Sequence, residues 1–352
     1  MLGLEYFKFA DVWSPVFLAF MLLITAGYFV LIGPGGGKWA AEERVPAGRK
    51  LLFAAGMALL YLAQGGPVEL LGHMMFSFHM ISMALSYLVA PPLLMLGIPP
   101  WVWRKVAVFL AGSPLRQLRF LVKPVAAAVV FNGLFSFYHI PAVHDYVMLH
   151  FGVHRLYYIV LFIASGLMWW TLVNPLPERP GAQGLKKMGF IFLNMVLLTP
   201  ACGLIIFAKE PLYATYSDPN VWARAMGYCV SGNPAMLLSQ FGGPQFFGFL
   251  EPGIDQQVGG ILMKFIQEFI FASMLAYVFY QWYKQENRGG DDEELAVQLA
   301  GTRGHSEARE LSGVRESSGV REHSEARELS EVRELSDLRL DAAIIPPGKV
   351  AE

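Results

Sequence analysis

Residues 13–32 read WSPVFLAFMLLITAGYFVLI, a run of twenty residues without a charged side chain. A helix needs about 20 apolar residues to cross the hydrocarbon core of a bilayer, which is about 30 Å thick. The run therefore predicts a transmembrane helix. The rest of the chain points the same way, because 55% of its 352 residues are hydrophobic, more than a typical soluble domain contains.

Six further apolar runs are long enough, or nearly so, to be membrane spans. They lie near residues 51–66, 74–96, 123–140, 155–176, 186–208 and 258–283. Because backbone polar groups in lipid must be satisfied within the segment, each run is expected to be a helix. We predict an all-α membrane protein whose residues 1–285 form a bundle of about seven transmembrane helices. No small-residue cleavage site follows the first run, so we expect it to be retained.

Basic residues alternate between the two sides of the predicted bundle. They are dense in the loops between spans one and two, three and four, and five and six: Lys38, Arg44, Arg49, Lys50, Arg104, Lys105, Arg116, Arg119, Lys123, Arg179, Lys186 and Lys187. The intervening segments carry Arg155, Lys209 and Arg224. Loops rich in lysine and arginine stay in the cytoplasm. The pattern therefore predicts an extracytoplasmic N-terminus and a cytoplasmic C-terminus.

Residues 286–352 differ in composition from the predicted bundle. From Ser306 the sequence repeats every six residues, beginning with Ser-Glu-Ala-Arg-Glu-Leu. Residues 1–283 hold 17 Lys or Arg and 12 Asp or Glu, a formal +5, whereas residues 284–352 hold 10 and 16, a formal −6. A period of six matches neither the helical repeat nor the heptad. We expect an acidic, mostly disordered cytoplasmic tail; a weak helix that docks on a partner is the alternative.

Six of the eight histidines fall at the predicted extracytoplasmic end of the bundle. They are His73, His79, His139, His144, His150 and His154. Methionines surround the first two, in the stretch HMMFSFHMISM of residues 73–83. Imidazole and thioether ligands together suit copper, and Cu(I) in particular, better than they suit hard cations. The pattern favours a copper site at this end.

Two local patterns identify the leading candidate ligands. His79 and Met83 are four residues apart, so they share one face of a helix with Met75. Pro141 interrupts the fourth span and can turn the chain so that His139 and His144 approach each other. Both patterns also have an ordinary structural explanation. Methionine fills gaps between helices, and interfacial histidines can lie among the tyrosines of an aromatic belt.

Other polar residues are weaker candidates. Asp145 and Asp255 are positioned to orient an imidazole as outer partners. Lys264 and Glu268 are four residues apart in the last span, and an intramembrane charge pair marks function by default. For this pair we favour a mutually satisfied contact that fixes helix packing. Cys202, in the sixth span, is a weak candidate for copper. The remaining candidate ligands, besides His79 and His139, are His73, His144, His154 and Met83.

Several classes of function leave no trace in the sequence. There is no phosphate-binding loop, no dinucleotide-binding glycine pattern, no zinc-protease HExxH and no CxxCH haem attachment site. Nothing in the distribution of basic residues suggests a nucleic-acid partner. The expected surroundings are therefore the lipid bilayer and other membrane proteins.

An ordered series of short motifs resembles one membrane protein family. The motifs are GP at 66–67, FSFHMISM at 76–83, APPLLMLGIP at 90–99, FSFYHIP at 135–141, MWW at 168–170, NPLPE at 174–178, YATYSDP at 213–219 and DQQ at 255–257. Together they are similar to the CtaG family of cytochrome c oxidase assembly factors of Gram-positive bacteria. The resemblance covers residues 1–285 and leaves the tail outside.

The resemblance implies a multi-pass protein of the bacterial plasma membrane that helps to mature the haem–copper oxidase. It implies copper delivery or insertion, oxidase subunits as partners, and no catalysis of its own. Many relatives carry a second histidine four residues after the first, where this chain has Met83. A His79–Met83 site would favour Cu(I).

We therefore expect an assembly factor that binds copper transiently at the extracytoplasmic face. Three alternatives remain open. Two histidines on different helices could ligate haem in a membrane oxidoreductase. A copper permease would need ligands through the whole bilayer, whereas these stop near one end. A scaffold for oxidase subunits would need no metal.

Overall fold

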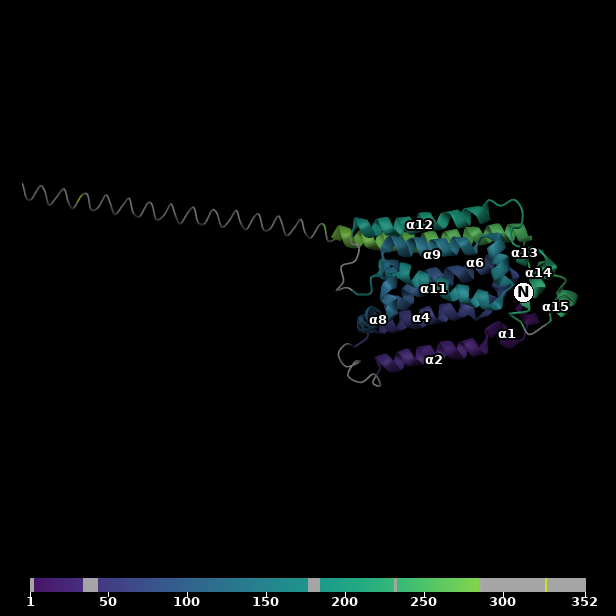
Figure 1. Ribbon diagram of the computed structural model, residues 1–352, viewed down its shortest axis with the longest axis horizontal. Coiled ribbons are helices and arrows are strands. Elements are labelled where there is room, and N and C mark those ends of the chain that lie inside the picture. Colours follow the sequence, from purple (N-terminus) through teal and green to yellow (C-terminus); the bar gives the residue numbers. More distant parts are fainter. Residues whose placement is uncertain are drawn as a thin grey trace, which may run out of the picture. The chain divides into compact units, whose positions relative to one another are not determined.

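The computed structural model describes residues 3–33, 44–176, 184–230 and 233–284, together with residues 286 and 327. Every regular element in this part of the chain is a helix (Figure 1). The chain divides into two compact units, Met1–Trp282 and Tyr283–Glu352. The predicted repeat tail lies almost wholly outside the described residues, so its disorder stays a prediction.

Six helices in the described part are long and apolar enough to cross a membrane. They are Phe9–Ile32 (α1 Phe9–Trp13 and α2 Pro15–Ile32), Ala47–Met74 (α4 Ala47–Gln64 and α5 Pro67–Met74), Phe76–Gly97 (α6 Phe76–Ala84, η3 Leu85–Val89 and α7 Ala90–Gly97), α11 Phe151–Val173, α12 Leu185–Ile206 and Pro252–Lys284. A seventh candidate is α9 Pro124–Tyr138 with α10 Pro141–Met148, which meet at a bend of 78°. The predicted all-helical membrane fold is confirmed, with six spans, or seven if the bent pair is one.

The second span is longer than the predicted 51–66. Pro67 is the first residue of α5, where its missing N–H has no helical partner to lose. The chain therefore passes Gly65 and Gly66 and continues as a helix to Met74. The break comes at Met75, whose backbone is extended (φ −134°, ψ 131°). His73 consequently belongs to the end of the second span, whereas the predicted second span ended at residue 66.

The third span contains a π-helical turn, η3, ahead of two prolines at the start of α7. Pro91 has no N–H, so the carbonyl of Tyr87, four residues earlier, has no partner within the helix. Two side chains of α11 donate hydrogen bonds to this carbonyl, Ser165 Oγ at 2.5 Å and Trp169 Nε1 at 3.1 Å. These bonds tie the middle of the third span to α11.

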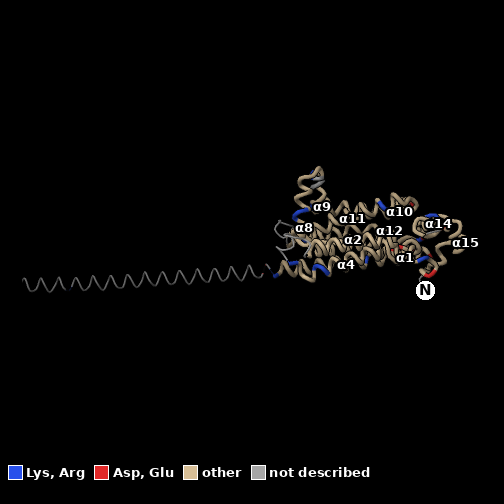
Figure 2. Tube along the Cα trace, turned by 90° about the horizontal axis from the view of Figure 1, so that it is seen from below, with Lys and Arg blue, Asp and Glu red and all other residues tan. Residues whose placement is uncertain are grey.

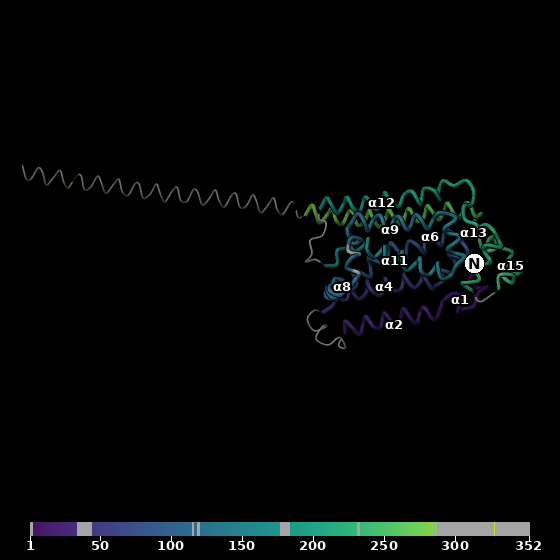
Figure 3. The backbone as a smooth tube through the Cα atoms, viewed as in Figure 1, coloured from purple at the N-terminus to yellow at the C-terminus, as the bar shows by residue number. Residues whose placement is uncertain are grey.

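Residues 207–251, here called the cap, form short helices at one end of the bundle. They are α13 Ala214–Ser217, α14 Pro219–Met226, α15 Pro234–Phe241 and η5 Pro244–Phe246. Figures 1 and 3 place them beside the N-terminal segment. Trp222 and Met226 of the cap pack with Leu70, Leu71 and Met74 of α5 in one hydrophobic cluster. The cap therefore rests on the ends of the second and third spans.

Helix α8 (Pro100–Gly112) and the 3₁₀ helix η4 (Pro114–Val122) connect the third span to α9. They lie at the end of the bundle opposite the cap (Figure 1). Lysines and arginines recur at this end in Figure 2. The two ends of the bundle thus differ in chemistry, as the alternation of basic loops indicated.

Candidate metal site

Five histidines are buried where the spans meet the cap. They form what we call the histidine cluster, with exposed fractions of 6% for His73, 3% for His79, 5% for His139, 0% for His144 and 4% for His154. They come from α5, α6, the residue after α9, α10 and α11 respectively. The predicted gathering of these five histidines from separate segments is therefore present in the fold.

Three of the rings surround Tyr138. The His79 ring centroid lies 5.2 Å from that of His144 and 6.1 Å from that of His139. Tyr138 stacks on His79 at 5.7 Å and meets His139 and His144 edge-on at 5.1 and 5.2 Å. Pro141 produces this arrangement, because it starts α10 and turns it across the end of α9. The turn brings His144 to the ring of Tyr138, which also contacts His139.

The other two histidines form a neighbouring pair. His73 and His154 meet edge-on with centroids 5.7 Å apart. The His154 ring also contacts Tyr158, at 4.2 Å, and the Tyr158 hydroxyl lies 3.3 Å from that of Tyr138. Tyrosines thus connect the two groups of histidines into one aromatic cluster.

Sequence reasoning missed an ion pair beside His73. Glu69 is largely buried in α5, and its Oε1 lies 3.1 Å from Nη1 of Arg155 on α11. The sequence did hold a signal, because Glu69 is an acidic residue in an apolar segment, one helical turn before a histidine. The pair clamps α5 to α11 at the level of the cluster.

Hydrogen bonds to backbone carbonyls orient two rings of the cluster. Nδ1 of His139 donates to the carbonyl of Phe135 at 2.8 Å, and Nδ1 of His73 donates to the carbonyl of Glu69 at 2.9 Å. A carbonyl can only accept, so Nδ1 carries a proton in each of these rings, and Nε2 has a free lone pair whenever the ring is neutral. Backbone carbonyls orient metal-ligating histidines in the same way.

Several nitrogens of the cluster have no hydrogen-bond partner in the described protein. They are Nε2 of His79, His139 and His154 and both nitrogens of His144. Leaving a buried polar group unpaired costs about 1–3 kcal/mol, so a group of them needs an explanation such as a bound ion. Imidazole nitrogens are ligands that suit copper, zinc, iron and nickel.

Two tyrosines of the cap close the cluster. The Tyr213 hydroxyl donates to the carbonyl of His139 at 2.9 Å, and its ring lies 4.6 Å from that of His144. The Tyr216 hydroxyl donates to the carbonyl of Gly72 at 2.7 Å. Burial raises the pKa of both phenols, so both stay protonated and keep donating at neutral pH. The sequence motif at 213–219 contains these residues, but nothing in it indicated that they face the histidines.

The two aspartates considered as outer partners mainly hold backbone. Asp145 accepts hydrogen bonds from the N–H groups of Ala214 and Thr215, at 3.0 and 3.1 Å. Its Oδ1 lies 3.6 Å from Nδ1 of His144, too long for a hydrogen bond. Asp255 accepts from the hydroxyl of Ser77, at 2.5 Å, and from its N–H. Asp145 thus fixes the cap, and Asp255 fixes the start of α6.

Two parts of the predicted ligand set are not arranged as expected. His150 is exposed; it precedes α11, and its ring stacks on Tyr146 with centroids 4.1 Å apart. Met75 sits at the extended break before α6, so the proposed stripe reduces to His79 and Met83. Met83 is fully buried one turn further along α6.

Among the described residues, no three His, Cys, Asp or Glu side chains form a group that could hold a metal ion. Metals that demand four such ligands, as structural zinc does, are therefore a poor match for the cluster. Cu(I) accepts fewer ligands and takes thioether sulfur, so two imidazoles, or one with Met83, would suffice.

Lys264 and Glu268 of the last span contact each other and α12. Lys264 Nζ is 2.5 Å from Oε1 of Glu268 and donates to Thr199 Oγ1 of α12 at 2.7 Å. This geometry matches the favoured interpretation, a satisfied pair that fixes packing between the last span and α12. Cys202 is buried in the main hydrophobic core.

Comparison with known proteins gives a match over most of the chain. The model of the cytochrome c oxidase caa3 assembly factor family matches residues 26–285. Similar curated proteins include uncharacterized proteins of Mycobacterium bovis and Mycobacterium tuberculosis, each 25% identical over 296 residues. These alignments cover 78% of the chain and 40% of each relative, so the chain spans less than half of their length. No solved structure matches the chain.

Proposed function

The chain belongs to the caa3-type cytochrome c oxidase assembly factor family, and from this membership we propose that it carries copper within the membrane for assembly of the oxidase. The cargo is Cu(I), held by the histidine cluster and passed to an oxidase subunit in the same bilayer. The role is non-catalytic. The proposal rests above all on one observation, the group of buried imidazole nitrogens that have no hydrogen-bond partner.

Three features of the cluster support Cu(I) as the cargo. Its ligands are neutral imidazoles with a thioether nearby, which suit a soft ion. A monovalent cation is also less costly to bury than a divalent one, because desolvation increases with charge. Finally, a site with few strong ligands releases its ion more readily than a closed four-ligand site, as transfer to a partner requires. His79 and His139 are the leading ligands, with His73, His144, His154 and Met83 in support.

The basic loops give the direction of delivery. They predict that the cap and the histidine cluster face the extracytoplasmic side. In this orientation the ion enters and leaves at the outer face and does not cross the bilayer, which distinguishes a carrier from a permease.

The test is Cu(I) binding by the purified full-length protein in detergent, in competition with a chromophoric chelator under reducing conditions. We expect one Cu(I) per chain, and His79→Ala and His139→Ala each to weaken binding by at least ~10-fold, the cost even of losing an outer partner of a metal ligand. His150→Ala is the matched control, because it removes an exposed histidine at the same end. It should leave the affinity unchanged.

Each other result points to a different function. Equal weakening by His150→Ala would move the site out of the cluster. A Soret band in the purified protein would identify haem as the ligand. Absence of copper in a protein on which oxidase maturation still depends would favour a metal-free scaffold.

A further inference from the structure

Helix α8 is the feature of the bundle that the copper proposal leaves unexplained. It has thirteen residues and none of them is buried. Val108 and Phe109 are each 73% exposed, and Phe120 on the adjoining η4 is 51% exposed. A water-facing helix with such side chains would be unfavourable. Some apolar surrounding therefore covers this face.

The charges on α8 and η4 are all of one sign. Arg104, Lys105, Arg116 and Lys123 are exposed, and no Asp or Glu occurs between Glu69 and Asp145. A short helix that combines exposed aromatic and aliphatic residues with lysine and arginine is typical of elements that lie in the plane of a membrane surface. Their positive charge favours contact with anionic lipid headgroups.

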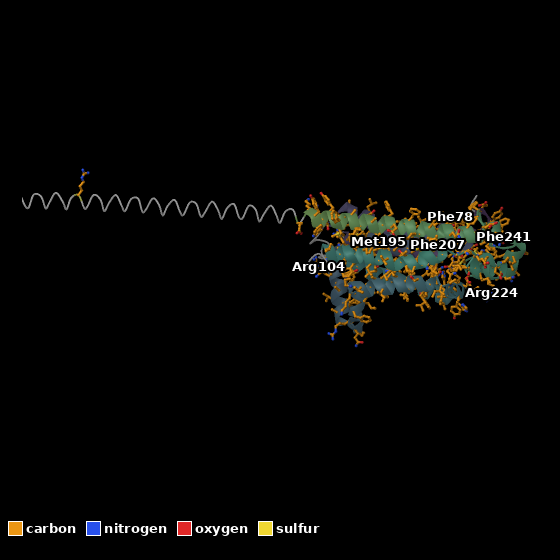
Figure 4. All side chains as sticks on the ribbon, turned by 90° about the horizontal axis from the view of Figure 1, so that it is seen from above. Phe78, Arg104, Met195, Phe207, Arg224 and Phe241 are labelled. Carbon is orange, nitrogen blue, oxygen red and sulfur yellow. The ribbon has the colours of Figure 1, made fainter. Side chains whose placement is uncertain are left out.

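Tryptophans hold α8 against the bundle. Trp103 Nε1 donates to the carbonyl of Met95 at 3.2 Å, and its ring meets that of Trp170 at 5.1 Å. Trp101 lies under the ammonium of Lys105, with Nζ 5.1 Å from the ring centroid. Tryptophan is enriched at the level of lipid headgroups. Figure 4 shows Arg104 at the end of the bundle opposite Arg224 and Phe241, as expected for a second membrane surface.

We propose that α8 and η4 form a binding site for anionic phospholipid. Val108, Phe109 and Phe120 insert among the acyl chains at the boundary with the headgroups, while Arg104, Lys105, Arg116 and Lys123 contact lipid phosphates. The occupant is the lipid of the leaflet in which this end of the protein lies. The inference does not depend on copper binding.

The experiment measures which lipid surrounds α8 in a bilayer. A dye is attached through Ala111→Cys, with Cys202→Ala and Cys229→Ala, and the protein is placed in nanodiscs of phosphatidylcholine with phosphatidylglycerol. One sample has brominated acyl chains on phosphatidylglycerol, the other on phosphatidylcholine. The two quenching amplitudes give the local lipid ratio. We expect the local ratio of phosphatidylglycerol to phosphatidylcholine to exceed the bulk ratio about fivefold, the effect of roughly 1 kcal/mol for a basic residue near the surface.

A paired substitution separates a specific site from the general charge of this end. Arg104→Gln with Lys105→Gln should lower the enrichment clearly, although Arg116 and Lys123 remain. Lys186→Gln with Lys187→Gln removes the same charge at the start of α12 and should leave the enrichment intact. Equal quenching by both lipids in the parent protein would overturn the proposal. So would an equal loss of enrichment in the two paired variants.

Discussion

Asp145 shows how one side chain can hold two distant parts of this protein together. It belongs to α10, yet its carboxylate accepts the N–H groups of Ala214 and Thr215 and the hydroxyl of Thr215. These donors are at the start of α13, where helical N–H groups have no partner of their own. The same aspartate follows His144, so the cap is fixed next to the histidine cluster.

Substitution of Asp145 should therefore destabilise the protein. In Asp145→Asn one oxygen becomes an amide donor that faces a backbone N–H, and the charge is lost. We expect the free energy of unfolding to fall by about 1–3 kcal/mol. The measurement is the midpoint of thermal unfolding in detergent, which should be lower than that of the parent.

The control for this substitution is Asp218→Asn. Asp218 caps α14 by accepting from Asn220 N and Val221 N at an exposed position. Asparagine caps helices about as well as aspartate, so this variant should unfold within about 0.5 kcal/mol of the parent. Equal effects of the two substitutions would show that Asp145 is an ordinary cap.

At the scale of elements, α5 and α6 approach each other closely beside the cluster. A Cβ at Gly72 would lie 3.1 Å from Cα and 3.2 Å from N of His79, which is tighter than normal packing. Gly72→Ala should therefore push the two helices apart and cost about 1–3 kcal/mol. It should also weaken Cu(I) binding, because His79 moves with its backbone.

Glycine substitution elsewhere in a span offers the comparison. A Cβ at Gly133 of α9 meets nothing within 4 Å, so Gly133→Ala should be neutral or stabilising by up to about 1 kcal/mol. The measurements are the unfolding midpoints and the Cu(I) affinities of Gly72→Ala and Gly133→Ala. Equal copper affinities would remove the link between helix spacing and the site.

A buried amide pair joins α9 to α12. Asn132 Nδ2 donates to Asn194 Oδ1 at 2.8 Å, and both side chains are about 2% exposed or less. Hydrogen bonds between membrane helices contribute about 0.6 kcal/mol on average. A double-mutant cycle of Asn132→Ala and Asn194→Ala should give a coupling energy of that order. A coupling of zero would mean that each amide is satisfied by its own helix.

Comparison of the predicted and observed helices shows which features the sequence could predict and which it could not. Hydropathy was enough to locate the spans, because each must bury its own backbone in lipid. It could not place the break at Met75 or the exposure of His150, since both depend on how one helix end packs against its neighbours. The contact of Asp145 with residues 214 and 215 joins positions about 70 apart in the chain, and no local pattern marks it.

For the whole molecule, the main untested prediction is its orientation. The basic loops predict that the cap lies outside and α8 in the cytoplasm. Met236→Cys in the cap and Gln117→Cys in η4, each without Cys202 and Cys229, put one thiol at either end. In intact spheroplasts a membrane-impermeant maleimide should label position 236 and label position 117 only after lysis. The reverse pattern would place the histidine cluster on the cytoplasmic side.

The ribosome synthesises the five histidines of the cluster before it synthesises the cap. All five histidines of the cluster precede residue 155, whereas Tyr213 and Tyr216 belong to the segment 207–251. At about 5–20 residues per second, the ribosome needs roughly 5–20 s to pass from His154 to the end of that segment. All five histidines of the cluster are therefore synthesised before the two phenols that pack against it.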